Sequence, residues 1–599
     1  MPFSRKVAFA CLLLLLVDFI VYFQTLAPAV QFMDSGELAV VCKTLGIAHP
    51  TGYPLYTLIG RLFALLPFKD EISRLNLFSF FSVCLTNLIL FLIILKLLKS
   101  ESDITIWTAL LTSLIFSFIP TWWSQATSNE VYALNVFFYS LIILMILIWR
   151  EKFQQEEKSN ILYLLIFVYG LSFGNHMMAV LLLPAILFML IAYERKALFR
   201  PSLMLSALLF FVLGLSIYLY LPIRSSQHPL LDWGNPESLS ALKRHLSGWQ
   251  YKDWLFAGSG EKLLSHFLNF VKLSLHQFPL YLLPFSFLGI WRLFVHDGKI
   301  LIFFLILFFA YVVYGISYNI EDIDPYFLGS FFVNAIFMGN GFFFVFEKWQ
   351  KIRLNKTIRT CIIFLFILLP MVTLKKNYFE QDRSRNYLAY DLGSNLVRSM
   401  KKDGLIITRV WDHYSVWLYL RYVELKRPDL VFLSEILSFF SWYQDYMKQN
   451  YPTIYQNSED QIESYVKEIS QVEKGEPYDL NLVREKALSM LNGFLLRNST
   501  PRPIYTDLGV EPEVGEMFVK IPEGLVYSLR SLFAYYPYDF PDYELRGIAD
   551  KTTYVDPRTR IYLQSYSFMI RNRIEYLRRL WQEEEALNLS EKYRHILLR

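Results

Sequence analysis

The first polar stretch of the chain carries residue types that could take part in acid–base chemistry. Residues 33–38 (MDSGEL) follow the first long apolar run by only a few positions. If a helix begins at Ser35, Asp34 lies at its N-cap and Glu37 one turn further on, so both carboxylates face the same helix end. A carboxylate held there could serve as a general base, whereas a pure capping role would explain the same pair without chemistry.

Two histidines form a second group of candidates. His49 is the first residue of the run HPTGYP at residues 49–54, and His176 lies between two apolar stretches. For the first run the alternative without chemistry is a rigid re-entrant turn. For His176 it is a hydrogen-bonded polar residue inside a helical bundle. His49 is the stronger functional candidate of the two.

Composition shows which elements must position these residues. The chain of 599 residues is 54% hydrophobic and 19% charged, and its mean hydropathy is +0.32. Lipid must therefore form part of its solvent, because soluble domains carry nearer 25% charged residues. Eleven apolar runs are long enough to predict transmembrane helices. They cover residues 7–27, 77–95, 104–120, 132–149, 160–174, 177–193, 203–222, 273–295, 300–319, 326–346 and 360–374.

The charged residues predict how these helices are oriented. Lys and Arg gather in the loops at 96–99, 150–158, 195–200 and 348–359, which the positive-inside rule assigns to the cytoplasm. The outward loops are then 28–76, 121–131, 223–272 and 320–325, where Asp, Glu, His, Trp and Tyr concentrate. We expect a transmembrane domain over residues 1–375 and a soluble extracytoplasmic domain over 376–599.

The C-terminal region predicts a mixed or mainly helical fold. Residues 405–410 and 430–433 are short β-like runs that flank a helical stretch at 414–425. Residues 557–598 form a charged helical tail. The four cysteines have no metal-ligand spacing, and the chain has no Lys/Arg-rich block, so neither a zinc motif nor nucleic-acid binding is indicated.

Several motifs, taken in order, resemble one family of polytopic membrane proteins. They are DSGEL at 34–38, HPTGYPL at 49–55, NEVY at 129–132, GNH at 174–176, YLPIR at 220–224 and LDWG at 231–234. The family includes the eukaryotic transmembrane O-mannosyltransferase that acts on plexin-type receptors. The resemblance covers roughly residues 10–330 and extends more loosely to Asp412-His413 and Arg427-Pro428-Asp429.

This resemblance implies a glycosyltransferase of the GT-C architecture with about 11 transmembrane helices. Such an enzyme moves a sugar from a polyprenyl-phosphate donor to an extracytoplasmic acceptor, either a protein hydroxyl or a glycan. It also implies a catalytic carboxylate in the first outward loop, where Asp34 stands as the base and Glu37 as its partner. Arg224, His49 and His176 are the expected ligands of the donor phosphate.

Four outward residues suit the sugar or the acceptor. Asp232 can accept hydrogen bonds from sugar hydroxyls, and the indole of Trp233 can stack on the apolar sugar face, although packing of the loop would explain Trp233 equally well. Glu130 is a carboxylate at a helix mouth, and Tyr53 lies in the HPTGYP run.

Asp322 and Asp324 precede an apolar run, where an acidic first turn is favoured by the helix dipole and a divalent ion is the sharper alternative. Because a lipid-monophosphate donor has no pyrophosphate to neutralise, we expect no metal and no other cofactor beyond the lipid-linked sugar.

The same residues are compatible with two other functions. A transporter or flippase of lipid-linked sugar would also need intramembrane polar residues, and a non-catalytic assembly protein could keep the same scaffold. A bacterial cell would place the protein in the inner membrane with its active face in the periplasm. In a eukaryote the same topology places that face in the lumen of the endoplasmic reticulum.

Overall fold

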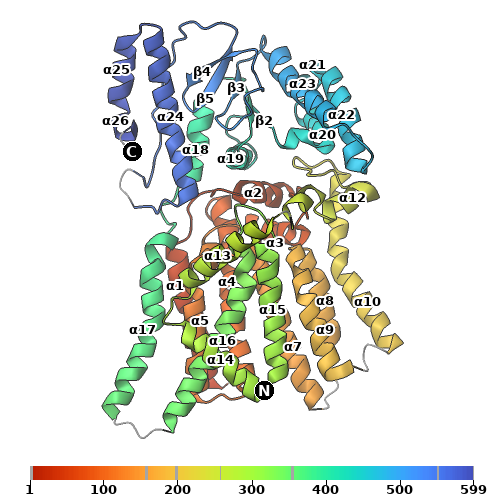
Figure 1. Cartoon of the computed structure of the whole chain (residues 1–599), viewed down its shortest axis with the longest axis vertical. Helices are drawn as coiled ribbons and strands as arrows, with labels where there is room; N and C mark the ends of the chain where they lie inside the picture. Colours follow the sequence, from red (N-terminus) through yellow and green to blue (C-terminus); the bar gives the residue numbers. More distant parts are fainter. Residues whose placement is uncertain are drawn as a thin grey trace. The chain divides into compact units, whose positions relative to one another are not determined.

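The chain divides into two compact units in the computed structural model, which describes residues 4–155, 160–195, 200–256, 258–351, 356–548 and 552–597 (Figure 1). Unit 1 comprises Met1–Leu26, His49–Ile223 and Leu239–Ser384. Unit 2 comprises Ala27–Ala48, Arg224–Ser238 and Arg385–Arg599. Two segments from the expected outward loops therefore group with the C-terminal residues. Parts of three basic loops, at 156–159, 196–199 and 352–355, lie outside the described residues.

Unit 1 is a bundle of apolar helices. In the described part of the chain, eight helices are long and apolar enough to cross a membrane, or nine if one bent pair is a single span. The bent pair is α5 (Asp103–Ser117) and α6 (Pro120–Thr127), which meet at 71°. Two shorter apolar helices are α8 (Ile161–Phe173) and α14 (Leu283–His296). The eight are α1 (Arg5–Gln24), α4 (Glu71–Leu98), α7 (Val131–Gln154), Met177–Glu194 with η1 and α9, Pro201–Ser225 with α10, η3 and α11, α15 (Gly298–Ile316), Asp324–Gln350 with η5 and α16, and Thr360–Gln381 within α17.

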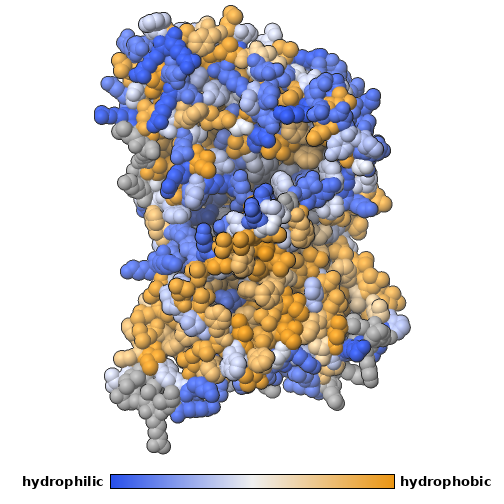
Figure 2. Space-filling view, in the orientation of Figure 1, coloured by the Kyte–Doolittle hydropathy of each residue, from blue (hydrophilic) through white to orange (hydrophobic). Residues whose placement is uncertain are grey.

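These helices confirm the predicted class of helical membrane protein. The expected run at 273–295 was wrong as one span, because α13 (Gly260–Gln277) ends before Pro279 and α14 begins at Leu283. Proline lacks the backbone N–H that a continuous helix needs. The two neighbouring runs at 160–174 and 177–193 are separate helices, as the sequence indicated. Figure 2 shows apolar side chains over the outer face of the unit 1 helices, as lipid solvation requires.

Short elements of unit 1 do not span. They are α3 (Pro54–Ala64), α12 (Leu239–Leu246) and η4 (Trp249–Trp254). Helix α12 places Ala241 and His245 on its buried side, while Leu239 and the lysine and arginine between them remain at least partly exposed. The one polar side chain that α12 buries is that of His245.

Unit 2 is built around a mixed five-stranded sheet with the order β2-β1-β3-β5-β4. Strand β1 pairs in parallel with β2 and β3, whereas β5 pairs antiparallel with β3 and β4. The two β-like runs of the sequence are confirmed as β1 and β2. No pattern in the sequence predicted the other three strands. The strands are β1 (Leu405–Thr408), β2 (Val431–Ser434), β3 (Ile504–Thr506), β4 (Val519–Glu523) and β5 (Val526–Arg530).

Helices lie on both sides of this sheet in Figure 1. One group is α20 (Ser441–Asn450), α21 (Pro452–Asn457), α22 (Glu459–Lys474) and α23 (Leu480–Asn498). The other is α24 (Pro557–Arg579), α25 (Glu583–Lys592) and α26 (Arg594–Leu597), which confirms the predicted helical tail. The remaining helices are α2 (Ser35–Thr44), α18 (Leu388–Arg398) and α19 (Trp411–Tyr422), the last of which replaces the helical stretch expected at 414–425.

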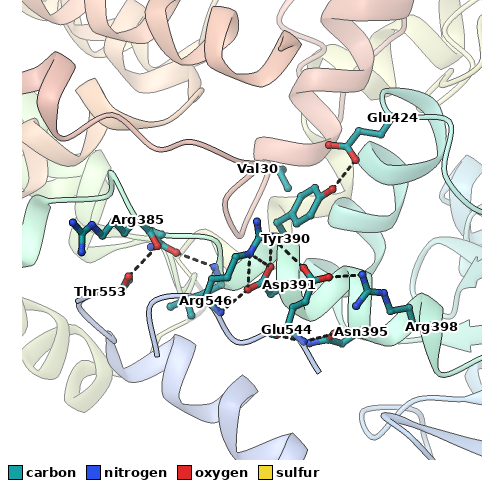
Figure 3. Close-up of polar contacts among 12 residues, drawn as sticks. Val30, Arg385, Tyr390, Asp391, Asn395, Arg398, Glu424, Glu544, Arg546 and Thr553 are labelled. Carbon is teal, nitrogen blue, oxygen red and sulfur yellow. Dashed lines mark hydrogen bonds and ion pairs between the residues drawn. The ribbon is translucent and has the colours of Figure 1, made fainter. Parts of the chain in front are cut away.

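A polar network fastens the segment between β5 and α24 to α18 (Figure 3). Arg546 donates to the Asp391 carboxylate from its backbone N at 2.8 Å and from Nε at 2.9 Å. The Asn395 amide donates to the carbonyl of Glu544 at 2.7 Å, and the Glu544 carboxylate pairs with Arg398. Because Asp391 is almost fully buried, its arginine partner is needed to stabilise the charge. The network fixes the path of the chain into α24.

Candidate active site

The carboxylate of Asp34 does not cap the helix that follows it. Asp34 occupies the N-cap position of α2, but its side chain makes no capping hydrogen bond. Instead, Asp34 Oδ1 accepts a hydrogen bond of 2.8 Å from the indole Nε1 of Trp411 in α19. The capping alternative is therefore wrong for Asp34. The acid is partly exposed, while Glu37 in the first turn of α2 is fully buried.

The first turn of α2 is held on the first turns of α19. A Cβ on Gly36 would lie 2.1 Å from the carbonyl oxygen of Ser415, so only glycine permits this approach. The backbone N–H of Glu37 donates to Ser415 Oγ at 3.2 Å. The glycine between the two acids thus has a packing role: it brings the acidic turn against α19.

Asp412 organises the same end of α19. Its buried carboxylate accepts from the backbone N–H of Met33, from Tyr562 and, at 3.0 Å, from Nε of Arg558. Tyr562 and Arg558 belong to α24, and the Tyr562 ring also packs on Phe32 at 4.9 Å. Residues from the expected first outward loop, from α19 and from α24 therefore meet around Asp34.

Trp233 packs in an aromatic cluster next to this acid. Its ring centroid lies 5.6 Å from that of Trp411 in an edge-to-face arrangement, and 5.2 Å from that of Trp442. Trp233 and Trp442 are buried, whereas Trp411 is partly exposed. The burial of Trp233 favours the packing alternative for this residue. Trp411 presents the accessible aromatic surface beside the carboxylate.

Arg224 makes contacts that differ from the expected phosphate role. Its Nε donates to the carbonyl of Leu45 at 2.6 Å, and another guanidinium nitrogen donates to the carbonyl of Thr44 at 3.0 Å. A third nitrogen donates to the side chain of Gln227. The guanidinium thus satisfies the last carbonyls of α2, which a helix leaves without intrahelical partners. These contacts give Arg224 a structural role.

Asp232 lies in a segment that pairs with the chain at Ile47. The backbone of Ile47 donates to the carbonyl of Leu231 at 2.7 Å, and Trp233 donates back to Ile47 at 3.3 Å. The Asp232 carboxylate accepts from Ser225 Oγ at 2.8 Å. Burial raises the pKa of the Asp232 carboxyl to about 6. This acid is therefore directed into the protein.

In unit 1, aromatic side chains surround the imidazole of His176. Its ring centroid lies 5.7 Å from those of Tyr53 and Tyr132, and 6.0 Å from that of Tyr326. His176 Nδ1 accepts from the backbone N–H of Met178 at 3.1 Å. In a neutral imidazole the proton is then on Nε2, which can donate to a ligand. The Tyr53 hydroxyl lies 2.9 Å from His49 Nε2, so the two predicted histidines share one cluster.

The asparagines beside these residues hold the cluster together. The Asn175 amide donates to the carbonyl of Val131 at 3.1 Å. The backbone of Asn129 donates to Asn76 at 2.9 Å, and that of Glu130 to Ser79 at 3.3 Å. The motifs HPTGYP, NEVY and GNH therefore converge, with Glu130 at the N-cap of α7. Glu130 and Asp322 lie close enough to Tyr132 to interact electrostatically with its hydroxyl.

His245 also belongs to this cluster, although no motif in the sequence predicted it. The ring is 3% exposed, and neither nitrogen has a hydrogen-bond partner among the described residues. Gly52 has φ +90°, and a Cβ there would lie 2.9 Å from His245 Nε2. Burial lowers the pKa of His245 to about 3, with a smaller contribution from His49. The only signal in the sequence was a histidine on the apolar side of a short amphipathic helix.

The acidic pair considered for a metal is not part of a candidate metal cluster in the described ranges. Asp322 and Asp324 do not belong to any group of three or more closely placed His, Cys, Asp or Glu ligands in the described ranges. Asp324 lies in the first turn of η5 (Asp324–Phe327), which leads into α16, and Asp322 precedes it. Other residues missed from the sequence are Trp442 and Arg558, whose positions relative to Asp34 depend on contacts across the whole of unit 2.

Comparisons with known proteins agree with the motif resemblance. Residues 34–198 match the family described as "Protein O-mannosyl-transferase TMEM260 N-terminal domain". The chain is 24% identical over 485 residues to "Protein O-mannosyl-transferase tmem260" of Dictyostelium discoideum, covering 74% of this chain and 59% of that protein. It is 26% identical over 470 residues to the Mus musculus protein of the same name, covering 73% and 64%. The chain therefore spans about three fifths of the length of these curated relatives.

The fold resembles that of a solved structure. The apo crystal structure of ArnT from Cupriavidus metallidurans matches with a TM-score of 0.53 and 13% sequence identity, over 88% of this chain and 99% of that chain. The family resemblance read from the motifs and the expected GT-C-like fold are both confirmed.

Proposed function

We propose that the protein is a membrane glycosyltransferase that moves a sugar from a polyprenyl-phosphate donor to a hydroxyl group on an extracytoplasmic protein or glycan. The curated relatives are named protein O-mannosyl-transferases, so mannose and a protein hydroxyl are the first donor sugar and acceptor to test. A donor with a lipid tail suits a chain whose unit 1 exposes apolar helices to the bilayer. The asymmetry of basic loops supports an active face outside the cytoplasm.

The position of Asp34 carries this proposal. Its carboxylate follows the first spanning helix, is partly exposed and is oriented by Trp411 instead of being used as a helix cap. In the proposed reaction the acceptor oxygen forms a bond to the anomeric carbon, and the bond from that carbon to the phosphate oxygen breaks. Asp34 accepts the hydroxyl proton, and polyprenyl phosphate leaves with the bonding electron pair.

The residues next to Asp34 fit an acceptor and sugar site in unit 2. Trp411 fixes one carboxylate oxygen through its N–H and leaves its ring face accessible for stacking on a sugar. Trp233 packs edge-to-face on that ring, and Trp442 packs on Trp233. In this proposal Glu37, which is buried in the same turn, is the partner of Asp34.

The histidine and tyrosine cluster of unit 1 fits the donor phosphate. His176 Nε2, His49 and His245 provide imidazole groups, and Tyr53 orients His49. Neutral imidazoles can donate hydrogen bonds to a phosphate, and a bound anion would also favour their protonation. In this proposal they replace Arg224, whose nitrogens are occupied by carbonyl and amide oxygens.

The deciding experiment separates sugar transfer from lipid transport. The purified full-length chain is placed in proteoliposomes with a radiolabelled polyprenyl-phosphate mannose and a serine- and threonine-rich peptide. We expect label on the peptide together with stoichiometric release of polyprenyl phosphate. Movement of intact lipid-linked sugar across the bilayer without peptide labelling would instead identify a flippase and overturn the proposal. Peptide labelling with empty liposomes serves as the background.

A further inference from the structure

The segment of unit 2 between Ser225 and Glu237 gathers three side chains that can ligate a metal. His228, Asp232 and Glu237 each bring one ligand atom into a group whose members all lie within 4.8 Å of one another. His228 Nδ1 is 3.4 Å from Glu237 Oε1. A surface ion pair would explain His228 and Glu237 alone, but it would not explain the third member.

Asp232 provides the independent observation. Its side chain is 9% exposed, so the carboxylate is held inside the protein. One oxygen accepts from Ser225, whereas Oδ1 is enclosed and has no hydrogen-bond partner in the part of the chain that the structure describes. An enclosed carboxylate oxygen without a donor is destabilising, because it loses water and gains nothing in return.

Hydrogen-bond donors are also too few around this carboxylate. The Ser225 hydroxyl lies 2.8 Å from Asp232 Oδ2 and 3.0 Å from Asn235 Oδ1, yet it has one proton for both oxygens. The side chain of Asn235 also hydrogen-bonds to the carboxylate of Asp445, which fixes its NH₂ toward that acid. Oxygen acceptors therefore outnumber donors, and a cation would supply what the protein lacks.

The ligand types identify the class of cation. One imidazole with two carboxylates suits Zn²⁺, whereas Mg²⁺ and Ca²⁺ prefer oxygen ligands alone. Zn–N and Zn–O bonds of about 2.1 Å in a tetrahedron place neighbouring ligand atoms about 3.4 Å apart. The separation of His228 Nδ1 and Glu237 Oε1 equals this edge. Both side chains are exposed and can rotate toward Asp232, which leaves the fourth position for water.

We propose that His228, Asp232 and Glu237 bind one Zn²⁺ ion, which fixes the loop that carries Trp233. The ion neutralises the buried carboxylate and ties the two ends of the loop together. Trp233 follows Asp232 directly in the sequence and packs on Trp411. An ordered loop therefore also fixes the position of Trp233 against Trp411. The site is structural and does not depend on the proposed transferase reaction.

Metal content tests the proposal directly. Full-length protein without an affinity tag is stripped with EDTA, incubated with Zn²⁺, desalted and measured by elemental mass spectrometry. We expect wild type to hold one equivalent more than Glu237→Gln or His228→Gln, two exposed positions where substitution should not prevent folding. Co²⁺ in place of Zn²⁺ should give the visible absorption of a tetrahedral site in wild type and lose it in both variants. EDTA should lower the Tm of wild type only.

A matched control is available in unit 1. His276 Nε2 also lies 3.4 Å from a glutamate oxygen, that of Glu380, but these two residues are not part of a three-ligand group among the described residues. His276→Gln should therefore retain the zinc content and the Co²⁺ spectrum of wild type. Equal zinc content in wild type and Glu237→Gln would overturn the proposal, as would an equal loss in His276→Gln.

Discussion

Trp411 donates a hydrogen bond of 2.8 Å from its indole Nε1 to the carboxylate of Asp34, although 377 residues separate the two in the sequence. The bond comes from the first turn of α19, which also holds the backbone of Met33 through Asp412. One helix of unit 2 thus orients both the side chain and the backbone of the acidic turn. Trp411 is a positioning residue in the proposed mechanism.

The variant Trp411→Phe removes this hydrogen bond while keeping an aromatic ring. We expect kcat to fall about tenfold, because an unoriented carboxylate accepts the proton less efficiently. The KM for the lipid donor should not change, because Trp411 contacts the proposed base and is not one of the proposed phosphate ligands. Trp417→Phe is the control, since Trp417 is buried in the same helix and its Nε1 has no hydrogen-bond partner among the described residues. Equal kcat values for the two variants would contradict the role of the Trp411 N–H.

The variant Gly36→Ala tests the close packing of α2 on α19. The added methyl group would meet the Ser415 carbonyl at 2.1 Å, and backbone must move to relieve it. We expect a loss of about 1–3 kcal/mol in unfolding free energy, seen as a lower Tm in detergent, together with loss of transfer. Gly298→Ala is the control, because no heavy atom lies within 4 Å of the position of its Cβ. An unchanged Tm for Gly36→Ala would mean that α2 does not pack there.

Hydropathy and local motifs predicted much of this structure, because both depend on short-range properties of the chain. Apolar runs indicated the spanning helices, and the acids around Gly36 indicated a functional turn. The close approach of Gly36 to Ser415 could not be predicted, since nothing near residue 36 encodes a partner in α19.

Long-range contacts also bear on the interpretation of two predicted residues, Arg224 and Trp233. The sequence showed Arg224 at the end of a span, where a free guanidinium would suit phosphate. It did not show that the chain reverses so that Thr44 and Leu45 present their carbonyls to it. Trp233 was equally open to stacking and packing until the positions of Trp411 and Trp442 were known.

The variant Arg224→Lys should therefore act on stability and leave donor binding unchanged. A lysine can reach one carbonyl at the end of α2 but cannot bond both in the arginine geometry. We expect a loss of about 1 kcal/mol in unfolding free energy with an unchanged KM for polyprenyl-phosphate sugar. Arg484→Lys, in an exposed ion pair, should alter neither quantity. A raised donor KM with an unchanged Tm would restore Arg224 to the phosphate site.

The buried ring of His245 predicts a dependence of stability on pH. Its pKa is lowered to about 3 in the folded protein, against about 6.5 when unfolded, so the unfolded chain takes up a proton first as pH falls. Stability contributed by the neutral ring is present above pH 6.5 and is lost toward pH 3. Between pH 7 and pH 5 this loss amounts to about 2 kcal/mol.

His245→Gln should flatten this dependence, since glutamine does not titrate. Tm values measured in detergent at pH 7 and pH 5 should differ less for the variant than for wild type. His296→Gln, at an exposed position of α14, should keep the wild-type difference. If His245→Gln lost as much stability as wild type on acidification, the neutral buried ring would not be the cause.

The variant Asp34→Asn addresses the proposed base itself. Asparagine keeps the size of the side chain and an oxygen that can accept from Trp411, but it cannot take up the acceptor proton. We expect the unfolding free energy to stay within about 1 kcal/mol of wild type, while turnover falls by roughly a hundredfold or more. Glu37→Gln should cost less turnover if Glu37 supports the base without accepting the proton. The measurement is transfer from polyprenyl-phosphate mannose to peptide by purified proteins of equal Tm.

A true N-cap aspartate provides the control for Asp34. Asp70 precedes α4, and its Oδ1 accepts from the backbone N–H of Ser73 at 2.8 Å. Asparagine caps helices about as well as aspartate, so Asp70→Asn should keep both Tm and turnover. The contrast between the two substitutions separates the charge needed for chemistry from the oxygen needed for a helix end. Transfer by Asp34→Asn at the wild-type rate would remove Asp34 from the mechanism, because an asparagine amide cannot accept the proton of the acceptor hydroxyl.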